Sequence, residues 1–401
     1  MRFRAAPHDG RHHAYRFDDE QRRARLGRRH LLVPSMRTTS AVAVAGALVA
    51  LHATDPATVH LSVCARLVTP EVGTVEQALH EDVSPVRLLS LRNTLFTMST
   101  DVAPAVDASN ARAVAAKERQ RLLKHLQEDG TGLAERWLAE TEQQTLVTLT
   151  TRGRATGSEL SAALPARRTK ITIFPGPKQE TVQGIASRVI QVLAADERIR
   201  RDRPRGSWTS SQFRRTTAEP WSASDPAEAR TEVARRWLHS YGPATEDDLK
   251  WWTGWGIRET RAALVAVGAE EVLLDSGAVG WVVPGDLLTE SSPEPWAAPL
   301  PGLDPSAMGW AVRGFHLPAD HRAALFDRAG NIGPTVWWNG GTVGGWAQRA
   351  DGELVWRLLP DVGGGQAPQL IEAEAARFSA GVGGARITPR FRTPLERELV
   401  V

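Results

Sequence analysis

One order of elements recurs in this chain and limits what it can fold into: three short helices followed by two strands. The last copy is the clearest, with helices and a hairpin expected at 231–240, 245–253, 258–267 and 271–283. Tyr241-Gly242-Pro243 ends the first of these helices, and Ser276-Gly277 turns the hairpin. Three helices closed by a two-stranded hairpin make the winged form of the helix-turn-helix motif.

Two earlier segments follow the same order. In the first, apolar periodicity predicts helices at 41–51, 57–67 and 75–80, followed by a strand-like run at 86–98. In the second, helices are expected at 135–151, 157–164 and 181–196, and strands at 198–201 and 207–215. The sequence therefore predicts an α+β fold built on three tandem winged-helix motifs.

The pattern changes after the Pro-containing segment at 291–293. Glycines become frequent, apolar residues alternate, and Asn339-Gly340-Gly341 marks a hairpin, all of which is typical of antiparallel strands. Two helices, at 319–329 and 368–379, interrupt a C-terminal domain that is expected to be β-rich and barrel-like. The predicted divisions are a disordered tail and then four domains, at 1–19, 20–112, 113–222, 223–292 and 293–401.

The composition excludes several classes of protein. Cys64 is the single cysteine among 401 residues, so neither an internal disulfide nor a cysteine-ligated zinc site is expected. The best candidate for a membrane span, Ala41–Leu51, is shorter than the ~20 residues that a spanning helix needs. We therefore predict no metal, no cofactor, no membrane and no obligate protein partner, and we expect the protein in the cytoplasm at the nucleoid.

The densest basic cluster lies where the second hairpin is expected. Between residues 196 and 215, arginines alternate with Ser, Thr and Trp. Arginine forks and hydroxyl groups suit DNA phosphates, and an aromatic side chain can enter a groove. The resulting candidates for DNA binding are Arg203, Arg205, Ser207, Trp208 and Ser210. The alternative is a solvated charged face, since Asp196, Glu197 and Asp202 offset part of the charge.

Two further places are candidates for contacts with DNA. Arg258 begins the third helix of the last unit, the helix that enters the major groove in regulators of this type. Trp338 and Asn339 lie at a hairpin turn, where an exposed aromatic ring can wedge between bases. The alternative for Trp337 and Trp338 is a place in the core of the β-rich domain.

The candidate catalytic segment, LHATDP at 51–56, lies at the turn between the first two helices. It brings the imidazole of His52, the hydroxyl of Thr54 and the carboxylate of Asp55 within four residues. Pro56 disfavours a helical conformation at Asp55, which makes Asp55 a suitable helix cap. By spacing alone, a capping aspartate and a surface histidine are the simpler interpretation.

The chain resembles the AlkZ/YcaQ-type winged-helix DNA glycosylases, bacterial enzymes that remove bulky alkylated bases. The stretches that carry the resemblance are LVALHATDPATVHLSVCARL (48–67), VRLLSLRNTLFTM (86–98), RPRGSWTSSQFR (203–214), the third winged helix (231–284) and TPRFRTPLEREL (388–399). It extends from about residue 20 to the C-terminus and keeps the order of the elements. The resemblance implies three tandem winged helices and a C-terminal β-domain around a basic, C-shaped channel.

The resemblance also implies a catalytic role for the 51–56 segment, with one departure. The family's signature is Gln-apolar-Gln or Gln-apolar-Asp before an Asp-Pro, and this chain has His52-Ala53-Thr54 there. A base alkylated at N7 leaves without protonation, so the enzyme has to place a water and stabilise a sugar cation. A neutral His52 and Thr54 are suited to share that water, and Asp55 supplies negative potential.

The predicted function is that of a monofunctional DNA glycosylase for bulky N7-alkylguanine adducts, which serves self-resistance to a DNA-alkylating natural product. Its expected partner is double-stranded DNA that carries alkylated bases. Arg87 and Arg92 match the family's arginine-rich strand, where they either hold phosphates or pair internally. No lysine lies near the motif, so lyase chemistry is not expected. The altered signature leaves a second hypothesis open: a non-catalytic DNA-binding protein, either a regulator or a protein that sequesters adducts.

Overall fold

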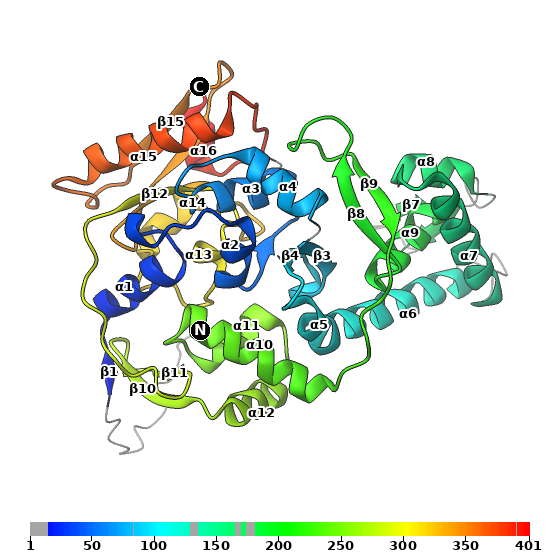
Figure 1. Cartoon of the computed structure of the whole chain (residues 1–401), viewed down its shortest axis with the longest axis horizontal. Coiled ribbons are helices and arrows are strands. Elements are labelled where there is room, and N and C mark those ends of the chain that lie inside the picture. Colours follow the sequence, from blue (N-terminus) through cyan, green and yellow to red (C-terminus); the bar gives the residue numbers. More distant parts are fainter. Residues whose placement is uncertain (1–14, 83, 129–134, 165–169, 174–180, 390) are drawn as a thin grey trace.

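The computed structural model describes residues 15–82, 84–128, 135–164, 170–173, 181–389 and 391–401. Figure 1 shows a large body and a smaller lobe at its side. The lobe contains the elements from residue 112 to residue 217, and the segments before and after them form the body.

The first unit follows the predicted order and has one extra strand. Its elements are α2 (Ala41–Ala47), β2 (Leu51–His52), α3 (Pro56–Cys64), α4 (Val72–His80), β3 (Pro85–Leu89) and β4 (Leu95–Ser99). Ser40 and Asp55 cap α2 and α3 by accepting hydrogen bonds from backbone N–H groups of the first turn. A 3-10 turn at Leu91–Asn93 divides the predicted strand-like run into a hairpin, and β2 completes a sheet of order β2-β4-β3. This sheet holds His52 immediately before α3.

The second unit forms the lobe. After α5 (Ala103–Val106), its elements are α6 (Arg112–Glu128), α7 (Glu135–Arg152), β5 (Ala155–Thr156), α8 (Gly157–Ala163), β6 (Lys170–Ile173), β7 (Thr181–Gly184), α9 (Ile185–Ala195), β8 (Ile199–Pro204) and β9 (Phe213–Thr217). The long helix α6 has no counterpart in the sequence prediction. The helix expected at 181–196 begins only at Ile185, because residues 181–184 pair with β6 as a strand.

The third unit confirms the expected helices and hairpin. Its elements are α10 (Pro226–Tyr241), α11 (Glu246–Thr253), α12 (Ile257–Val267), β10 (Glu270–Leu274) and β11 (Val279–Val282). Thr245 and Asp248 form a reciprocal capping box at the start of α11. The left-handed Gly254 and Gly268 end α11 and α12.

The N-terminal segment differs from the predicted tail at 1–19. Residues 1–14 lie outside the described part of the chain, but β1 (Arg16–Phe17) pairs in parallel with β10. Phe17 is buried, and the Arg16 guanidinium lies 2.9 Å from the Asp275 carboxylate. The next helix, α1 (Asp19–Arg29), is bound to the end of the third unit through ion pairs of Arg25 and Arg29 with Asp286. Residues 16 and 17 of the predicted tail are therefore part of the fold, because Phe17 fills an apolar site under the third hairpin.

The C-terminal domain is an open sheet rather than a barrel. Four antiparallel strands follow in the order β12 (Ala297–Leu300), β13 (Thr335–Trp338), β14 (Gly341–Gln348) and β15 (Leu354–Leu358). Its helices are α13 (Pro305–Met308), α14 (Arg322–Leu325), α15 (Ala367–Val382) and α16 (Pro394–Leu399). The strands β12 and β15 do not pair with each other, and α15 packs against β12 while α16 packs against β14. The helix expected at 319–329 shrinks to α14 and a preceding 3-10 turn, since Asp327 turns the chain after it.

The cores follow the division into body and lobe. One continuous apolar core joins the first unit, the third unit and the C-terminal sheet, with Leu88, Trp237 and Trp337 among its fully buried members. The lobe has its own core, which includes Leu149 and Val189. Within the described residues, no helix combines the length and the apolar character that crossing a bilayer requires.

Candidate active site

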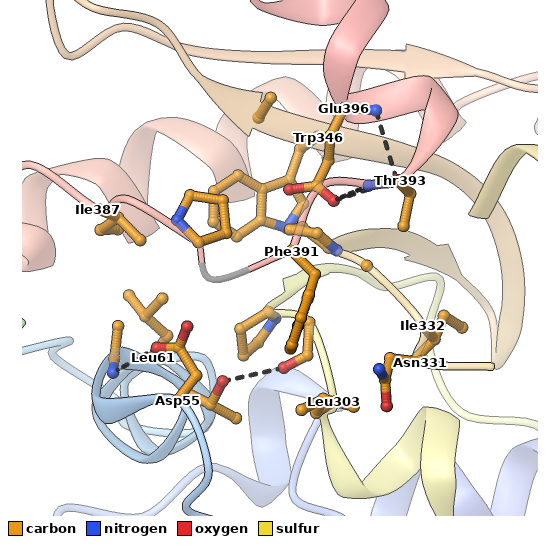
Figure 2. A pocket seen from close by; sticks show the side chains of 18 of the residues that line it. Asp55, Leu61, Leu303, Asn331, Ile332, Trp346, Ile387, Phe391, Thr393 and Glu396 are labelled. Atoms are coloured by element: carbon orange, nitrogen blue, oxygen red, sulfur yellow. Dashed lines mark hydrogen bonds between the residues drawn. The ribbon is translucent and has the colours of Figure 1, made fainter. Parts of the chain in front are cut away.

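Thr54 and Asp55 lie at the start of α3, on the wall of a cleft (Figure 2). The Asp55 Oδ1 atom accepts a hydrogen bond from the Ala57 N–H at 2.9 Å, which confirms that Asp55 caps the helix. The Thr54 hydroxyl has no hydrogen-bond partner within the described part of the chain and is half-buried. The Thr54 hydroxyl and the Asp55 carboxylate therefore lie at the same wall of the cleft, and the Thr54 hydroxyl can donate and accept hydrogen bonds there.

The cleft lies between α3 and the C-terminal domain and encloses about 750 Å³ when the space open to solvent is counted. Its lining is mainly apolar, with contributions from Leu61, Leu303, Ile332, Trp346 and Ile387. The space that the centre of a water-sized sphere can occupy is only about 70 Å³, so the cleft is narrow. Its apolar walls and few polar groups fix how a flat group lies against it.

The wall across from α3 comes from the C-terminal segment that resembles the glycosylase family. Phe391, which is half exposed, extends from this segment toward the α3 side of the cleft, and Thr393 and Glu396 lie behind it (Figure 2). The stretches 48–67 and 388–399 are far apart in the sequence, yet they form two walls of one cleft.

Two carboxylates in the cleft were not among the predicted site residues. Asp327 accepts hydrogen bonds from the Asn331 N–H and side-chain amide at 2.8 and 2.9 Å, which lower the pKa of Asp327 although burial opposes this. Glu396 accepts from the Thr393 N–H at 2.8 Å and caps α16, and burial raises the pKa of Glu396. Only the family-like stretch 388–399 marked this region, because neither carboxylate lies near the 51–56 segment in the sequence.

The structure separates His52 from this cleft. The His52 side chain is 5% exposed, packs on Phe96 with 4.4 Å between the ring centroids, and is not among the residues that line the cleft. Its Nε2 atom accepts from the Arg92 guanidinium at 3.2 Å, which places the ring proton on Nδ1, where no described group accepts it. The expected water shared by His52 and Thr54 is therefore not supported by the geometry.

Burial and the Arg92 charge together lower the pKa of His52 to about 3. The imidazole is therefore neutral at physiological pH, as the sequence led us to expect, but the reason is its place in the sheet.

Arg92 connects His52 to the surface of the third unit. Its guanidinium lies 4.0 Å from the ring centre of Trp251, and that of Arg313 lies 5.0 Å from the same ring. Burial lowers the pKa of Arg92 and of Arg313 to about 10. Arg92 also lines a second, polar cavity between the Leu91–Asn93 turn and the residues that join α11 to α12. This position allows Arg92 to reach a ligand, and its contact with DNA stays a prediction.

Arg87 lies in a different setting. It is buried in β3 with its guanidinium 5.7 Å from the Phe213 ring centre, and burial lowers its pKa to about 10 although the Glu76 and Asp202 carboxylates oppose this. Of the two roles left open for Arg87, the structure favours internal pairing.

The predicted DNA-binding hairpin β8–β9 is docked on the first unit (Figure 1). Arg203 lies 3.4 Å from Glu81 and 3.9 Å from Glu76 of α4. Trp208 is half-buried against the ring of His60 in α3, with centroids 5.1 Å apart. These two residues hold the lobe against the body, so their first role is structural.

The other residues of this hairpin remain accessible. Arg205 is exposed and lies 3.7 Å from Glu159. Ser207 is exposed and shares a hydrogen bond of 2.8 Å with Thr209, and the Ser210 hydroxyl accepts from the Gln212 N–H at 3.2 Å. Contacts of these residues with DNA stay a prediction.

The remaining two predicted sites differ in their surroundings. Arg258 is exposed on the first turn of α12, where it can reach a ligand. In the Trp338-Asn339 turn, Asn339 is exposed and accepts from the Trp296 N–H at 2.9 Å, and Trp338 is half-buried against the core. Gly340, at φ 80°, lets the turn lie on the backbone of Arg23. The α1 helix thus packs on one side of the turn, and a contact of Trp338 and Asn339 with DNA stays a prediction.

Within the described residues, no group of His, Cys, Asp and Glu side chains has the arrangement of a metal site.

Comparison with known proteins places the chain in a family. A family model for AlkZ-like DNA glycosylases matches residues 45–380. Among solved structures, Streptomyces sahachiroi DNA glycosylase AlkZ matches with a TM-score of 0.68 and 22% sequence identity, over 91% of this chain and 96% of that chain. Among curated proteins, none matches. The structural likeness shows a shared fold, and the family model covers most of the sequence. The chain therefore belongs to the family of AlkZ-like DNA glycosylases.

Proposed function

We propose that this DNA glycosylase hydrolyses the N-glycosidic bond of bulky N7-alkylguanine adducts, and that the base lies in the cleft beside Thr54 and Asp55. One observation carries the proposal: a largely apolar cleft opens beside Thr54 and Asp55, at the segment that matches the family's catalytic signature. A bulky, flat adduct finds apolar contacts there with Leu303, Trp346 and Phe391.

The chemistry requires little of the protein. Alkylation at N7 gives the purine a positive charge, so the bond from C1′ to N9 breaks with its electron pair passing to the purine. Water adds to C1′ and loses a proton to solvent. We assign Thr54 to holding this water and Asp55 to stabilising the sugar cation through its negative charge. Each of these steps uses only water and side chains of this chain.

His52 acts through Arg92 in this proposal, as a positioning residue. A neutral Nε2 accepts from the guanidinium and orients it over Trp251, at the polar cavity beside the Leu91–Asn93 turn, where Arg92 can hold a phosphate of the DNA. An imidazolium there would repel Arg92, so the low pKa of His52 keeps the pair intact at physiological pH.

The test is release of the base from a duplex that carries one N7-alkylguanine, read as alkali-labile strand breaks. We expect breaks at the adduct, none in unmodified duplex, and little dependence on flanking sequence. Adduct binding without breaks, or binding to one specific unmodified sequence, would instead establish the non-catalytic DNA-binding protein as the function.

Self-resistance is the biological role that fits a specificity for bulky adducts. Such a role puts the enzyme in the cytoplasm, at double-stranded DNA that carries alkylated bases, with no obligate protein partner. Deletion of the gene should sensitise the host to a bulky alkylating natural product more than to a simple methylating agent.

A further inference from the structure

The lobe meets the body at two junctions: the docked β8–β9 hairpin, and the two connections that lead into and out of the lobe (Figure 1). Within the described residues, no side chain of the lobe is among the buried members of the body's core, and Leu149 and Val189 belong to a core of the lobe alone. Trp208 packs only at the edge of the body's core. Two units with separate cores and a polar interface are expected to move relative to each other.

The first junction, the latch, is mostly charged. Its residues are Asp202, Arg203 and Trp208 on the lobe and His60, Glu76, His80 and Glu81 on the body. Arg203, whose side chain is 41% exposed, lies 3.4 Å from Glu81 and 3.9 Å from Glu76. His80 lies 3.8 Å from Asp202. Exposed ion pairs contribute little to stability, and salt screens them, so these charges hold the hairpin weakly.

The docked latch leaves polar atoms without partners. Arg203 Nε and His80 Nε2 are buried, and neither atom has a hydrogen-bond partner among the described residues. The Glu76 carboxylate is 2.7 Å from His60 Nε2 but 3.6 Å from His80 Nε2. A buried polar group without a partner costs free energy, and separation of the two surfaces would give both atoms access to water. This cost opposes the docking.

The second junction, the hinge, consists of two connections that lie side by side, residues 107–112 and 218–225. The first contains a π-helical turn, and helices often kink at such turns. The second has neither helix nor strand and is mostly exposed. Arg112 ties the two together, because its Nη2 donates to the carbonyl groups of Trp221 and Ser222 at 3.1 and 2.9 Å. Both connections therefore bend at one place.

We propose that the lobe turns about the hinge and that the latch holds it against α3 and α4, so that the chain alternates between a closed and an open form. The ion pairs of the latch set the balance, and salt shifts it toward the open form. His60 Nδ1 also donates to the Pro56 carbonyl at 3.3 Å, so the latch touches the helix that begins at the Asp55 cap. The balance exists without DNA and does not rest on the proposed function.

The experiment measures the distance between body and lobe with two spin labels on the full chain. Val68→Cys places one label on the body and Ser211→Cys places the other on the β8–β9 loop, and both positions are exposed. Cys64 is buried, and burial raises the pKa of its thiol to about 12, so Cys64 stays unlabelled. Pulsed electron resonance gives the distance distribution at about 50 and about 500 mM salt. We expect one main distance at low salt and a second, longer one at high salt.

Three variants locate the cause of the change. Arg203→Glu reverses the charge that faces Glu81 and should raise the ratio of open to closed form by about fivefold or more at low salt, the upper range for one exposed ion pair. Adding Glu81→Arg restores opposite charges and should return the closed distance. Arg205→Glu is the matched control, because Arg205 lies on the same hairpin but pairs with Glu159 inside the lobe. This control should keep the wild-type distribution.

A single distance that neither salt nor Arg203→Glu changes would show a lobe fixed to the body and overturns the proposal. Equal broadening in Arg203→Glu and Arg205→Glu overturns it too, because that result reflects a loosened hairpin rather than an open latch. If Arg203→Glu loses helix content by circular dichroism, Glu81→Gln replaces it, since this change removes the ion pair from the body side, and the same two outcomes decide. Failure of base release affects none of these readouts, because the measurement contains no DNA.

Discussion

The cleft beside Thr54 differs in its lining and in the way it is built from an arginine-lined cavity of the lobe, which lies among β8, β9 and the start of α8. The cleft has apolar walls with a few satisfied carboxylates, and it lies within the shared core of the body. The cavity has three guanidinium groups on a small sheet with a core of its own. The cleft therefore offers apolar contacts, and the cavity offers positive charge.

In the proposed function, recognition of the damaged base falls to the cleft. Selectivity for a damaged base needs a fixed, closely packed pocket, which the shared core can provide. Affinity for any duplex needs only charge at the right spacing. The β8–β9 hairpin joins the lobe to the body, because Trp208 and Arg203 dock it on α3 and α4 beside the candidate active site.

The largest expected effect is that of Asp55→Asn. Asparagine caps a helix as well as aspartate does, so the fold is kept while the cleft loses a negative charge. We expect the rate of base release to fall by ~10²-fold or more, with the Kd for duplex nearly unchanged. Single-turnover kinetics measure this, and a rate close to that of wild type would remove Asp55 from the mechanism.

The next effect tests the size of the cleft. Ile387→Trp fills part of the space beside Trp346, so bulky adducts should lose about tenfold in kcat/KM while 7-methylguanine is less affected. Ile387→Ala serves as the matched control that enlarges the cleft. Equal losses for large and small adducts would show that the base lies elsewhere.

A smaller effect concerns stability against pH. Burial lowers the pKa of His30 and of His52 to about 3, whereas an unfolded histidine titrates near ~6.5. Below pH 6.5 the unfolded chain binds more protons than the folded one, so the free energy of unfolding falls as the pH falls. His52→Gln should reduce this slope by up to about 1.4 kcal/mol per pH unit between pH ~6 and ~4.

Denaturant titrations of the variant and the wild type at several pH values isolate this contribution, because other groups titrate equally in both. Identical slopes would mean that His52 is accessible to protons in the folded state.

The same variant tests whether His52 positions Arg92. At neutral pH, the Gln side chain can still accept a hydrogen bond from Arg92, so base release should be largely retained.

The smallest effect is expected at the docked hairpin. Trp208→Ala removes the ring that packs on His60, which should lower the free energy of unfolding by about 1–2 kcal/mol. Affinity for duplex at fixed salt should change by less than about threefold. Thermal melting and anisotropy measure the two quantities, and a large loss of affinity with unchanged melting would return Trp208 to the DNA-binding surface.

The sequence predicted the local structure well because the relevant interactions are local. The helices of the first and third units, the caps at Ser40, Asp55 and Thr245, and the stop at Tyr241-Gly242-Pro243 depend on residues a few positions apart. Sequence patterns also led to the family, and they marked Thr54 and Asp55. The patterns did not predict the strand at 181–184, because this strand depends on its pairing with β6, which the helical periodicity of 181–196 does not reveal.

Only the tertiary structure decided which polar groups are available. The His52 side chain is buried against Arg92 because β2 pairs with β4 and the turn at Leu91–Asn93 brings Arg92 to it. The surroundings of the Trp338-Asn339 turn depend on α1, some 300 residues earlier in the chain. Arg201 and Arg215 face each other only through the strand register. The sequence by itself determined the helices, the strands and the family. Burial, charge pairing and cavity shape arise between distant segments, so only packing determined which side chains are exposed, charged or able to bind a ligand.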